Sequence, residues 1–179
     1  MKKKMMMVTI LSLIGLVASG AICYVTKSSV CFSVAITFGT TFYHFAMRLM
    51  VGYLIGRKYQ KHMDPTNKWF AQKPFEPKLY KLLQVKKWKK RLPTYNPQDF
   101  DLKNHSMEEI VQVMCQSEVV HEVIMVLSFV PIAFTVWFGS MGVFVLTSCV
   151  ACLFDGMFVI MQRYNRPRLM RVMKKIPRK

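Results

Sequence analysis

Residues 5–25 read MMMVTILSLIGLVASGAICYV, a run without a single charged side chain. At about 1.5 Å of rise per residue, a helix of this length crosses about 30 Å of hydrocarbon. Three further apolar blocks follow, at about residues 30–55, 121–138 and 143–162. The sequence therefore predicts an all-α membrane protein with about four transmembrane helices.

The four apolar blocks form two pairs, and each pair is joined by a short turn, at residues 26–29 and 139–142. We therefore expect two helical hairpins within a single membrane domain over residues 1–179. A loop over residues 56–120 connects the hairpins, and a basic tail over residues 163–179 follows the last span.

The charge is strongly unbalanced, because 26 Lys and Arg oppose 9 Asp and Glu, a net charge of +17. Nearly all the cations lie at residues 1–4, 57–103 and 163–179, so the positive-inside rule predicts that both termini and the central loop are cytoplasmic. With 53% hydrophobic residues, the chain is too apolar to be disordered. The long runs without charge argue against a soluble nucleic-acid binder, so we expect membrane lipid as a partner and no nucleic acid.

The N-terminus also resembles a secretory signal peptide, since a Lys-rich start precedes an apolar run with small residues at 18–20. The apolar run continues through Val25 and is longer than a typical signal core. This length favours a first span that is retained rather than cleaved.

The central loop is rich in aromatic residues, which are interleaved with Lys and Arg over residues 56–105. Within it, residues 78–91 predict a basic helix that contains Trp88 and lies in the membrane interface against anionic lipid. One interpretation is that the loop only anchors the protein to the membrane surface. The other is that some of its cations hold a phosphate-bearing substrate, and both roles can hold at once.

A capping box at residues 106–109, with Ser106 at the N-cap and Glu109 three residues later, predicts the start of a helix. The helical spacing of apolar residues then continues with no stop before Pro131. One long helix is therefore expected to rise from the cytoplasm into the third span. Glu118, His121 and Glu122 share one face of this helix near the membrane boundary.

Two ionisable residues, His44 and Arg48, lie four residues apart on one face of the second span. Such groups inside a span are costly and indicate function by default, and Asp155 in the fourth span is a candidate partner for Arg48. One interpretation is a buried Arg48–Asp155 pair that only holds the helices together. The other is a polar cavity open to the cytoplasmic leaflet and lined by His44, Arg48, Glu118, His121 and Asp155.

Glu118 and His121 have the E-x-x-H spacing of di-iron helical bundles, but such a site needs a second copy that this chain lacks. Cys149 and Cys152 form one C-x-x-C, also without a partner pair. We therefore predict no metal. A Glu within reach of a His can instead orient the imidazole and leave its other nitrogen free as a general base.

The last span ends at residues 162–169, which read QRYNRPRL. Arginine offers planar, multi-donor geometry that suits phosphate recognition. Simple positive-inside anchoring is the alternative, although the segment is more varied than anchoring requires. The candidate phosphate ligands in this segment are Arg163, Asn165, Arg166 and Arg168.

The ending QRYNRPRL after an apolar span resembles the C-terminus of the bacterial glycosyl-4,4'-diaponeurosporenoate acyltransferases. Three other features agree in order: NKWF at residues 67–70, VKKWK at residues 85–89, and the E-x-x-H at residues 118–121. The resemblance covers roughly residues 67–172. It implies a multi-pass enzyme of the bacterial cell membrane that esterifies a sugar hydroxyl of a glycosylated carotenoid, or of another glycolipid or isoprenoid, with a fatty acyl chain.

The resemblance also implies acyl-CoA or another acyl carrier as co-substrate, and it implies no cofactor. We predict His121, Glu118, His44 and Arg48 as catalytic residues, with His121 as a base oriented by Glu118. We predict as substrate-binding residues Arg163, Asn165, Arg166, Arg168, Trp88 and Asp155. Two other functions stay open: a non-enzymatic membrane scaffold or partner subunit, and a lipid-modifying enzyme of different chemistry.

Overall fold

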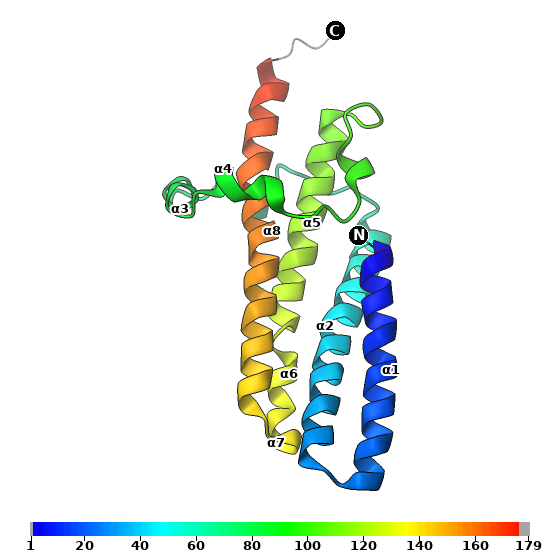
Figure 1. Cartoon of the computed structure of the whole chain (residues 1–179). Helices are drawn as coiled ribbons and strands as arrows, with labels where there is room; N and C mark the ends of the chain where they lie inside the picture. The colour runs from blue at the N-terminus through cyan, green and yellow to red at the C-terminus, as the bar shows by residue number, and fades with distance from the viewer. Residues whose placement is uncertain (1, 176–179) are drawn as a thin grey trace. The chain divides into compact units, whose positions relative to one another are not determined.

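The structure is a computed structural model that describes residues 2–175 (Figure 1). These residues form α-helices, 3-10 turns and connecting segments, and no β-strand occurs among them. Four helical stretches are long and apolar enough to cross a membrane, namely Lys2–Thr26, Ser29–Tyr59, Met107–Phe138 and Met141–Lys175. The predicted all-α membrane fold with four spans is confirmed.

The described residues divide into two compact units, one over residues 2–53 and 123–154 and the other over residues 54–122 and 155–175. Three helices, α2 (Ser29–Tyr59), α5 (Met107–Leu127) and α8 (Met141–Lys175), contribute residues to both units. The single membrane domain expected over residues 1–179 stays a prediction.

In the first unit, α1 (Lys2–Thr26) and α2 lie side by side as a hairpin (Figure 1). The face of α1 that is packed is made of small residues, because its buried side chains are Ser12 and Ser19 and Gly15 lies between them. A Cβ atom added at Gly15 would lie only 2.6 Å from the ring of Phe38 on α2. Small residues thus let the two helices approach closely, as is typical of helix packing in membranes.

The second hairpin of this unit contains a break near Pro131. The helix α5 ends at Leu127 and is followed by two short helices, α6 (Val130–Ala133) and α7 (Thr135–Phe138), before α8 begins at Met141. The expectation of an unbroken helix up to Pro131 is therefore wrong. Proline has no backbone N–H and its ring clashes with the carbonyl four residues earlier, which here belongs to Leu127.

The Leu127 carbonyl nevertheless has a donor, because the Tyr43 hydroxyl on α2 donates a hydrogen bond of 2.8 Å to it. In hydrocarbon every backbone polar group needs a partner within the protein. The Tyr43 hydroxyl thus replaces the N–H that Pro131 lacks. Beside this break the first unit has an open apolar pocket of about 340 Å³, whose lining includes Leu16, Phe32, Gly39, Tyr43, Pro131 and Phe134.

We predict that Tyr43→Phe lowers the free energy of unfolding by about 1 kcal/mol, because it leaves the Leu127 carbonyl without a donor. Thermal unfolding in detergent measures this loss. In a Pro131→Ala background, residue 131 regains its N–H, so the same substitution should cost clearly less. Tyr24→Phe, at an exposed tyrosine of α1, serves as the matched control. An equal cost of Tyr43→Phe in both backgrounds would contradict this explanation.

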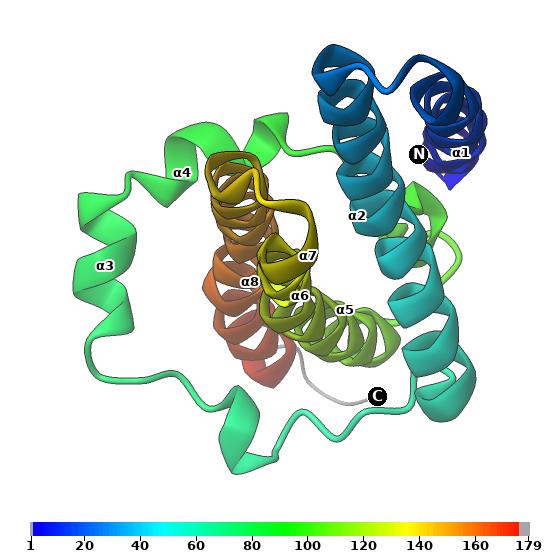
Figure 2. The same cartoon turned by 90° about the horizontal axis from the view of Figure 1, so that it is seen from below.

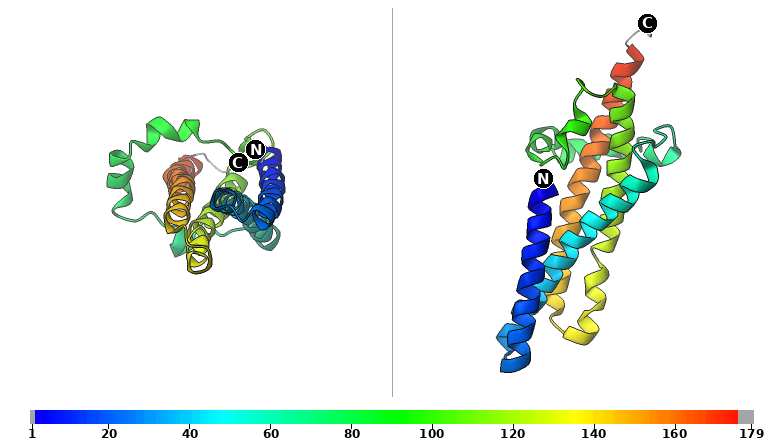
Figure 3. Two further views of the ribbon diagram at one scale, coloured as in Figure 1. Left: turned by 60° about the horizontal axis from the view of Figure 1, so that its bottom comes forward. Right: turned by 90° about the vertical axis from the view of Figure 1, so that its right-hand side faces the viewer.

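In the second unit, residues 60–106 form a belt that passes around the C-terminal half of α8 (Figures 2 and 3). The belt contains only short elements: η1 (Lys68–Phe70), α3 (Glu76–Leu82), α4 (Val85–Trp88), η2 (Lys89–Arg91) and η3 (Pro97–Phe100). The single helix expected over residues 78–91 is therefore wrong, because Gln84 adopts a left-handed conformation with φ 49° between α3 and α4.

The break at Gln84 has a packing reason. On a straight helix Tyr80 and Val85 would point about 140° apart. In the structure both are buried in one cluster against Tyr164 of α8. The indole N–H of Trp88 donates to the Leu83 carbonyl at 2.8 Å and closes the turn.

The predicted capping box is confirmed. The Ser106 backbone N–H donates to the Glu109 carboxylate at 2.8 Å, and the Glu109 N–H donates to the Ser106 hydroxyl at 3.2 Å. The basic tail expected over residues 163–179 is helical as far as it is described, since α8 continues through Pro167 to Lys175. The side chains of Arg163, Asn165 and Arg166 bind α5 or the belt, and these contacts favour a helix despite the proline. Residues 176–179 lie outside the described part.

Candidate functional site

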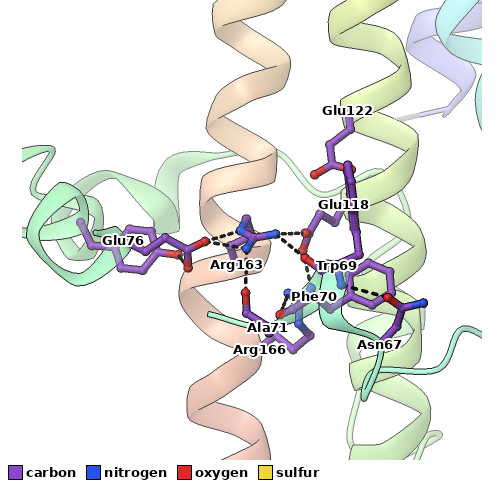
Figure 4. A network of polar contacts seen from close by, with 10 residues as sticks. Asn67, Trp69, Phe70, Ala71, Glu76, Glu118, Glu122, Arg163 and Arg166 are labelled. Atoms are coloured by element: carbon purple, nitrogen blue, oxygen red, sulfur yellow. Dashed lines mark hydrogen bonds and ion pairs between the residues drawn. The ribbon is translucent and has the colours of Figure 1, made fainter. Parts of the chain in front are cut away.

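A buried network of ion pairs joins α5, α8 and the belt in the second unit (Figure 4). Arg163 and Arg166 lie three residues apart on α8, so both face the same neighbour. One carboxylate oxygen of Glu118 on α5 accepts from Arg163 at 2.6 Å, and the other accepts from Arg166. Glu118 is fully buried and Arg166 is 1% exposed.

The belt adds a second carboxylate, Glu76 at the start of α3. The Nε of Arg163 donates to Glu76 at 2.7 Å, so this arginine bridges Glu76 and Glu118. The other Glu76 oxygen accepts from the Tyr80 hydroxyl at 2.7 Å. Burial, together with this bond to a carboxylate, raises the pKa of the Tyr80 phenol above its ordinary value.

Three successive backbone carbonyls of the belt complete the network. Arg163 donates to the carbonyls of Trp69 at 3.2 Å and Ala71 at 3.0 Å, and Arg166 donates to the Phe70 carbonyl at 2.6 Å. These carbonyls end the short turn η1, whose start is capped by the Asn67 side chain. Carbonyls at the end of a helical turn lack partners within it, and here the two guanidinium groups supply them.

The two glutamates and the two arginines balance each other in charge. The two guanidinium groups, which the sequence analysis assigned to phosphate, donate to carboxylates and carbonyls of the protein itself. The network therefore holds the belt against α5 and α8. The role of Arg163 and Arg166 in substrate binding stays a prediction.

We predict that Glu118→Gln destabilises the protein by roughly 3–5 kcal/mol, because it leaves the buried charge of Arg166 without its carboxylate. Glu108→Gln, at an exposed glutamate on the same helix, should change stability by less than about 0.5 kcal/mol. Thermal unfolding measures both variants, and trypsin digestion of the native protein should cut the belt faster only in Glu118→Gln. A Glu118→Gln variant with wild-type unfolding and belt protection would show that the network does not hold the belt.

A second polar pair lies in the same unit, between His121 on α5 and Asp155 on α8. The Nδ1 atom of His121 is 2.8 Å from a carboxylate oxygen of Asp155. Asp155 is 1% exposed, whereas the His121 side chain is 20% exposed. The imidazole stacks on Phe158 with ring centroids 4.5 Å apart and planes 7° apart, so its orientation is fixed from two sides.

The three polar residues expected on one face of α5 contact three different groups. Glu118 binds the two arginines, His121 binds Asp155, and Glu122 accepts from the Trp69 indole N–H at 2.8 Å. The carboxylate that contacts His121 is therefore Asp155 rather than the predicted Glu118. Spacing alone favoured Glu118, but buried arginines attract its charge more strongly than a histidine does.

A third cluster gathers around Tyr164 on α8. The ammonium group of Lys89 lies 4.7 Å from the centroid of the Tyr164 ring, and the guanidinium of Arg168 lies 3.4 Å from the same centroid. Lys89 also donates to the side-chain oxygen of Asn165. Burial and the nearby charges of Arg168, Lys90 and Lys86 lower the pKa of Lys89 below its ordinary value.

The family model of the CrtO glycosyl-4,4'-diaponeurosporenoate acyltransferases matches residues 66–175, more than half of the chain. The chain belongs to this acyltransferase family. Neither the curated proteins nor the solved structures gave a match. The matched region of this CrtO-family protein contains the buried network, the His121–Asp155 pair and the cluster around Tyr164.

Two predicted site residues, His44 and Arg48, precede the region matched by the CrtO family model. They lie on α2 in the first unit, where the Arg48 guanidinium donates to the His44 carbonyl at 2.9 Å. The His44 ring is also edge-on to Tyr43, with centroids 5.6 Å apart. Their catalytic role, and the pairing of Arg48 with Asp155, stay predictions.

Sequence reasoning missed several residues of these clusters, among them Glu76, Lys89 and Tyr164. Glu76 could have been predicted from the sequence, because carboxylates are rare in so basic a loop. A negatively charged side chain there is an expected partner for a buried arginine. Lys89 gave no signal, since it lies within a run of similar cations. Trp88 packs against the cluster of Tyr80, Val85 and Tyr164, and its role in substrate binding stays a prediction.

Proposed function

We propose that this protein is an integral membrane enzyme that transfers a fatty acyl group to a hydroxyl of a glycosylated carotenoid, or of a related glycolipid or isoprenoid. Membership of the CrtO acyltransferase family supports the reaction class. The four apolar spans support a substrate that resides in the membrane. The single observation that carries the proposal is the His121–Asp155 pair, whose partly exposed imidazole is held by a buried carboxylate.

In this proposal His121 is the general base. Asp155 accepts a hydrogen bond from Nδ1–H, which fixes the tautomer and stabilises the imidazolium that forms during the reaction. The lone pair of Nε2 is then directed at the acceptor hydroxyl. Stacking on Phe158 limits rotation of the ring, so the nitrogen keeps one direction.

The proposed reaction is the attack of the acceptor oxygen on the carbonyl carbon of an acyl thioester. His121 takes the hydroxyl proton as the new C–O bond forms, and the C–S bond breaks when the tetrahedral intermediate collapses. The departing thiolate receives the same proton from His121, so the enzyme returns to its starting state. General-base catalysis of this kind contributes about 10²–10⁴-fold to the rate.

The buried network has a positioning role in this scheme. It joins the belt to the same two helices that carry His121 and Asp155. Arg163, Arg166 and Glu118 thus support the site without contacting the reacting atoms. Asn165 and Arg168 are left as the candidates for substrate binding at the end of α8.

We predict that His121→Gln and Asp155→Asn each lower turnover by about 10²-fold or more, because both remove the oriented base. Cells that make the glycosylated acceptor are fed labelled fatty acid, and lipid mass spectrometry detects the labelled ester. His62→Gln, at an exposed histidine of the belt, is the matched control and should keep full activity. Membrane content and unfolding of each variant separate loss of catalysis from loss of the protein.

Full activity of His121→Gln would refute its role as base. The absence of any labelled ester with wild-type protein, in cells that make the acceptor, would contradict acyl transfer. That result would favour the scaffold or the lipid-modifying enzyme of different chemistry.

We also propose that both termini and the belt are cytoplasmic, because the chain's cations concentrate there. In a cysteine-free background, single cysteines at Ser28 and Ser140 report on the two turns, and one at Lys103 reports on the belt. An impermeant thiol reagent added to intact cells should label the turn positions and leave Lys103→Cys unlabelled until the membrane is opened. Labelling of Lys103→Cys in intact cells would reverse the orientation.

A further inference from the structure

We propose that Lys89, Asn165 and Arg168 form a binding site for a phosphate group. The identification of that group with the acyl donor rests on the proposed function. The existence of the phosphate site does not.

The geometry brings two cations to one aromatic ring. Lys89 comes from the belt and Arg168 from α8, and both lie over Tyr164, at 4.7 Å and 3.4 Å from its centroid. The electron-rich ring attracts each cation, but two cations on one ring also repel each other. Such an arrangement is stabilised when an anion binds between or beside them.

Within residues 2–175, no carboxylate forms an ion pair with Lys89 or Arg168. Arg163 and Arg166, on the same helix, are bound to Glu76 and Glu118. Carboxylates of the protein thus neutralise Arg163 and Arg166, but none among the described residues is paired with Lys89 or Arg168. The lowered pKa of Lys89, caused by burial and by Arg168, Lys90 and Lys86, agrees with an excess of positive charge here.

The three side chains offer the donors that a phosphate needs. Arg168 supplies a planar set of N–H groups, and Lys89 supplies a compact ammonium charge. The oxygen of Asn165 accepts from Lys89, and the amide NH₂ of the same side chain is a donor suited to a phosphate oxygen. A phosphate monoester or a diphosphate, with about two negative charges, would balance the two cations.

The position of the site suits an extended donor. Arg168 lies 13 residues after Asp155 on α8, which corresponds to about 20 Å along a helix. A donor that reaches both places must carry its thioester far from its phosphate. Coenzyme A thioesters have this form, whereas an anionic phospholipid would present a phosphate without a thioester.

The test is binding, measured on the purified full chain in dodecyl maltoside, a detergent without phosphate. Palmitoyl-coenzyme A and inorganic pyrophosphate are the probes for a carrier phosphate, and a short-chain phosphatidylglycerol is the probe for a lipid headgroup. Lys89→Gln and Arg168→Gln should each weaken phosphate binding by about tenfold or more. Lys87→Gln, at an exposed lysine of α4 two residues before Lys89, is the matched control and should bind as wild type does.

A loss of affinity for palmitoyl-coenzyme A and pyrophosphate identifies a carrier phosphate as the ligand, and a loss confined to phosphatidylglycerol identifies a lipid headgroup. Wild-type affinity of both variants for all three probes, or no binding to wild type, overturns the proposal. Because Arg168→Gln can also affect folding, a second measurement uses the wild-type chain. Pyrophosphate should protect Lys89 from acetylation and leave Lys87 unprotected, and equal labelling with and without pyrophosphate counts against the site.

The binding test is independent of turnover. His121→Gln should keep wild-type affinity for palmitoyl-coenzyme A while it loses transfer. If the wild-type protein binds phosphate but transfers no acyl group, the acyltransferase mechanism is refuted and the phosphate site stands. If the wild-type protein transfers acyl groups but does not bind phosphate, the phosphate site is refuted and the mechanism stands.

Discussion

The second unit depends on the neutralisation of Glu118 by Arg163 and Arg166. A buried carboxylate without partners is costly, and so is a buried guanidinium, whereas the two together satisfy each other and three carbonyls of the belt. The belt is rich in Lys and Arg, whose like charges repel one another. The network fixes it to two membrane helices.

Polar groups on α8 follow one another in an order that fits a lipid-linked transfer. Asp155 holds the proposed base, Arg163 and Arg166 fix the belt, and Arg168 lies at the proposed phosphate site. In this proposal a single helix carries groups for chemistry, support and recognition at different heights. Membership of the CrtO family gives the reaction class, and this order suggests how one chain could bind a charged carrier while its acyl chain stays in lipid.

The first unit shows how a membrane helix tolerates a proline. Pro131 ends α5 early, and the hydroxyl of Tyr43 binds the carbonyl that the proline leaves without a donor. Pro131 is visible in the sequence, but the donor that compensates for it, Tyr43, lies 84 residues before the Leu127 carbonyl that it binds. Hydropathy therefore predicted the span, whereas the hydrogen bond that compensates for the break joins distant residues, which periodicity does not report.

The sequence by itself determined the four spans and the capping box at Ser106, because hydrophobic length and helix-start chemistry act over neighbouring residues. It also determined the family, through local motifs such as QRYNRPRL. Only the tertiary structure decided which carboxylate meets which cation, giving Asp155 to His121 and Glu118 to the arginines. The physical reason is that charge pairing in a buried site follows distance and burial in space, and residues spaced for contact along one helix compete there with partners from distant segments.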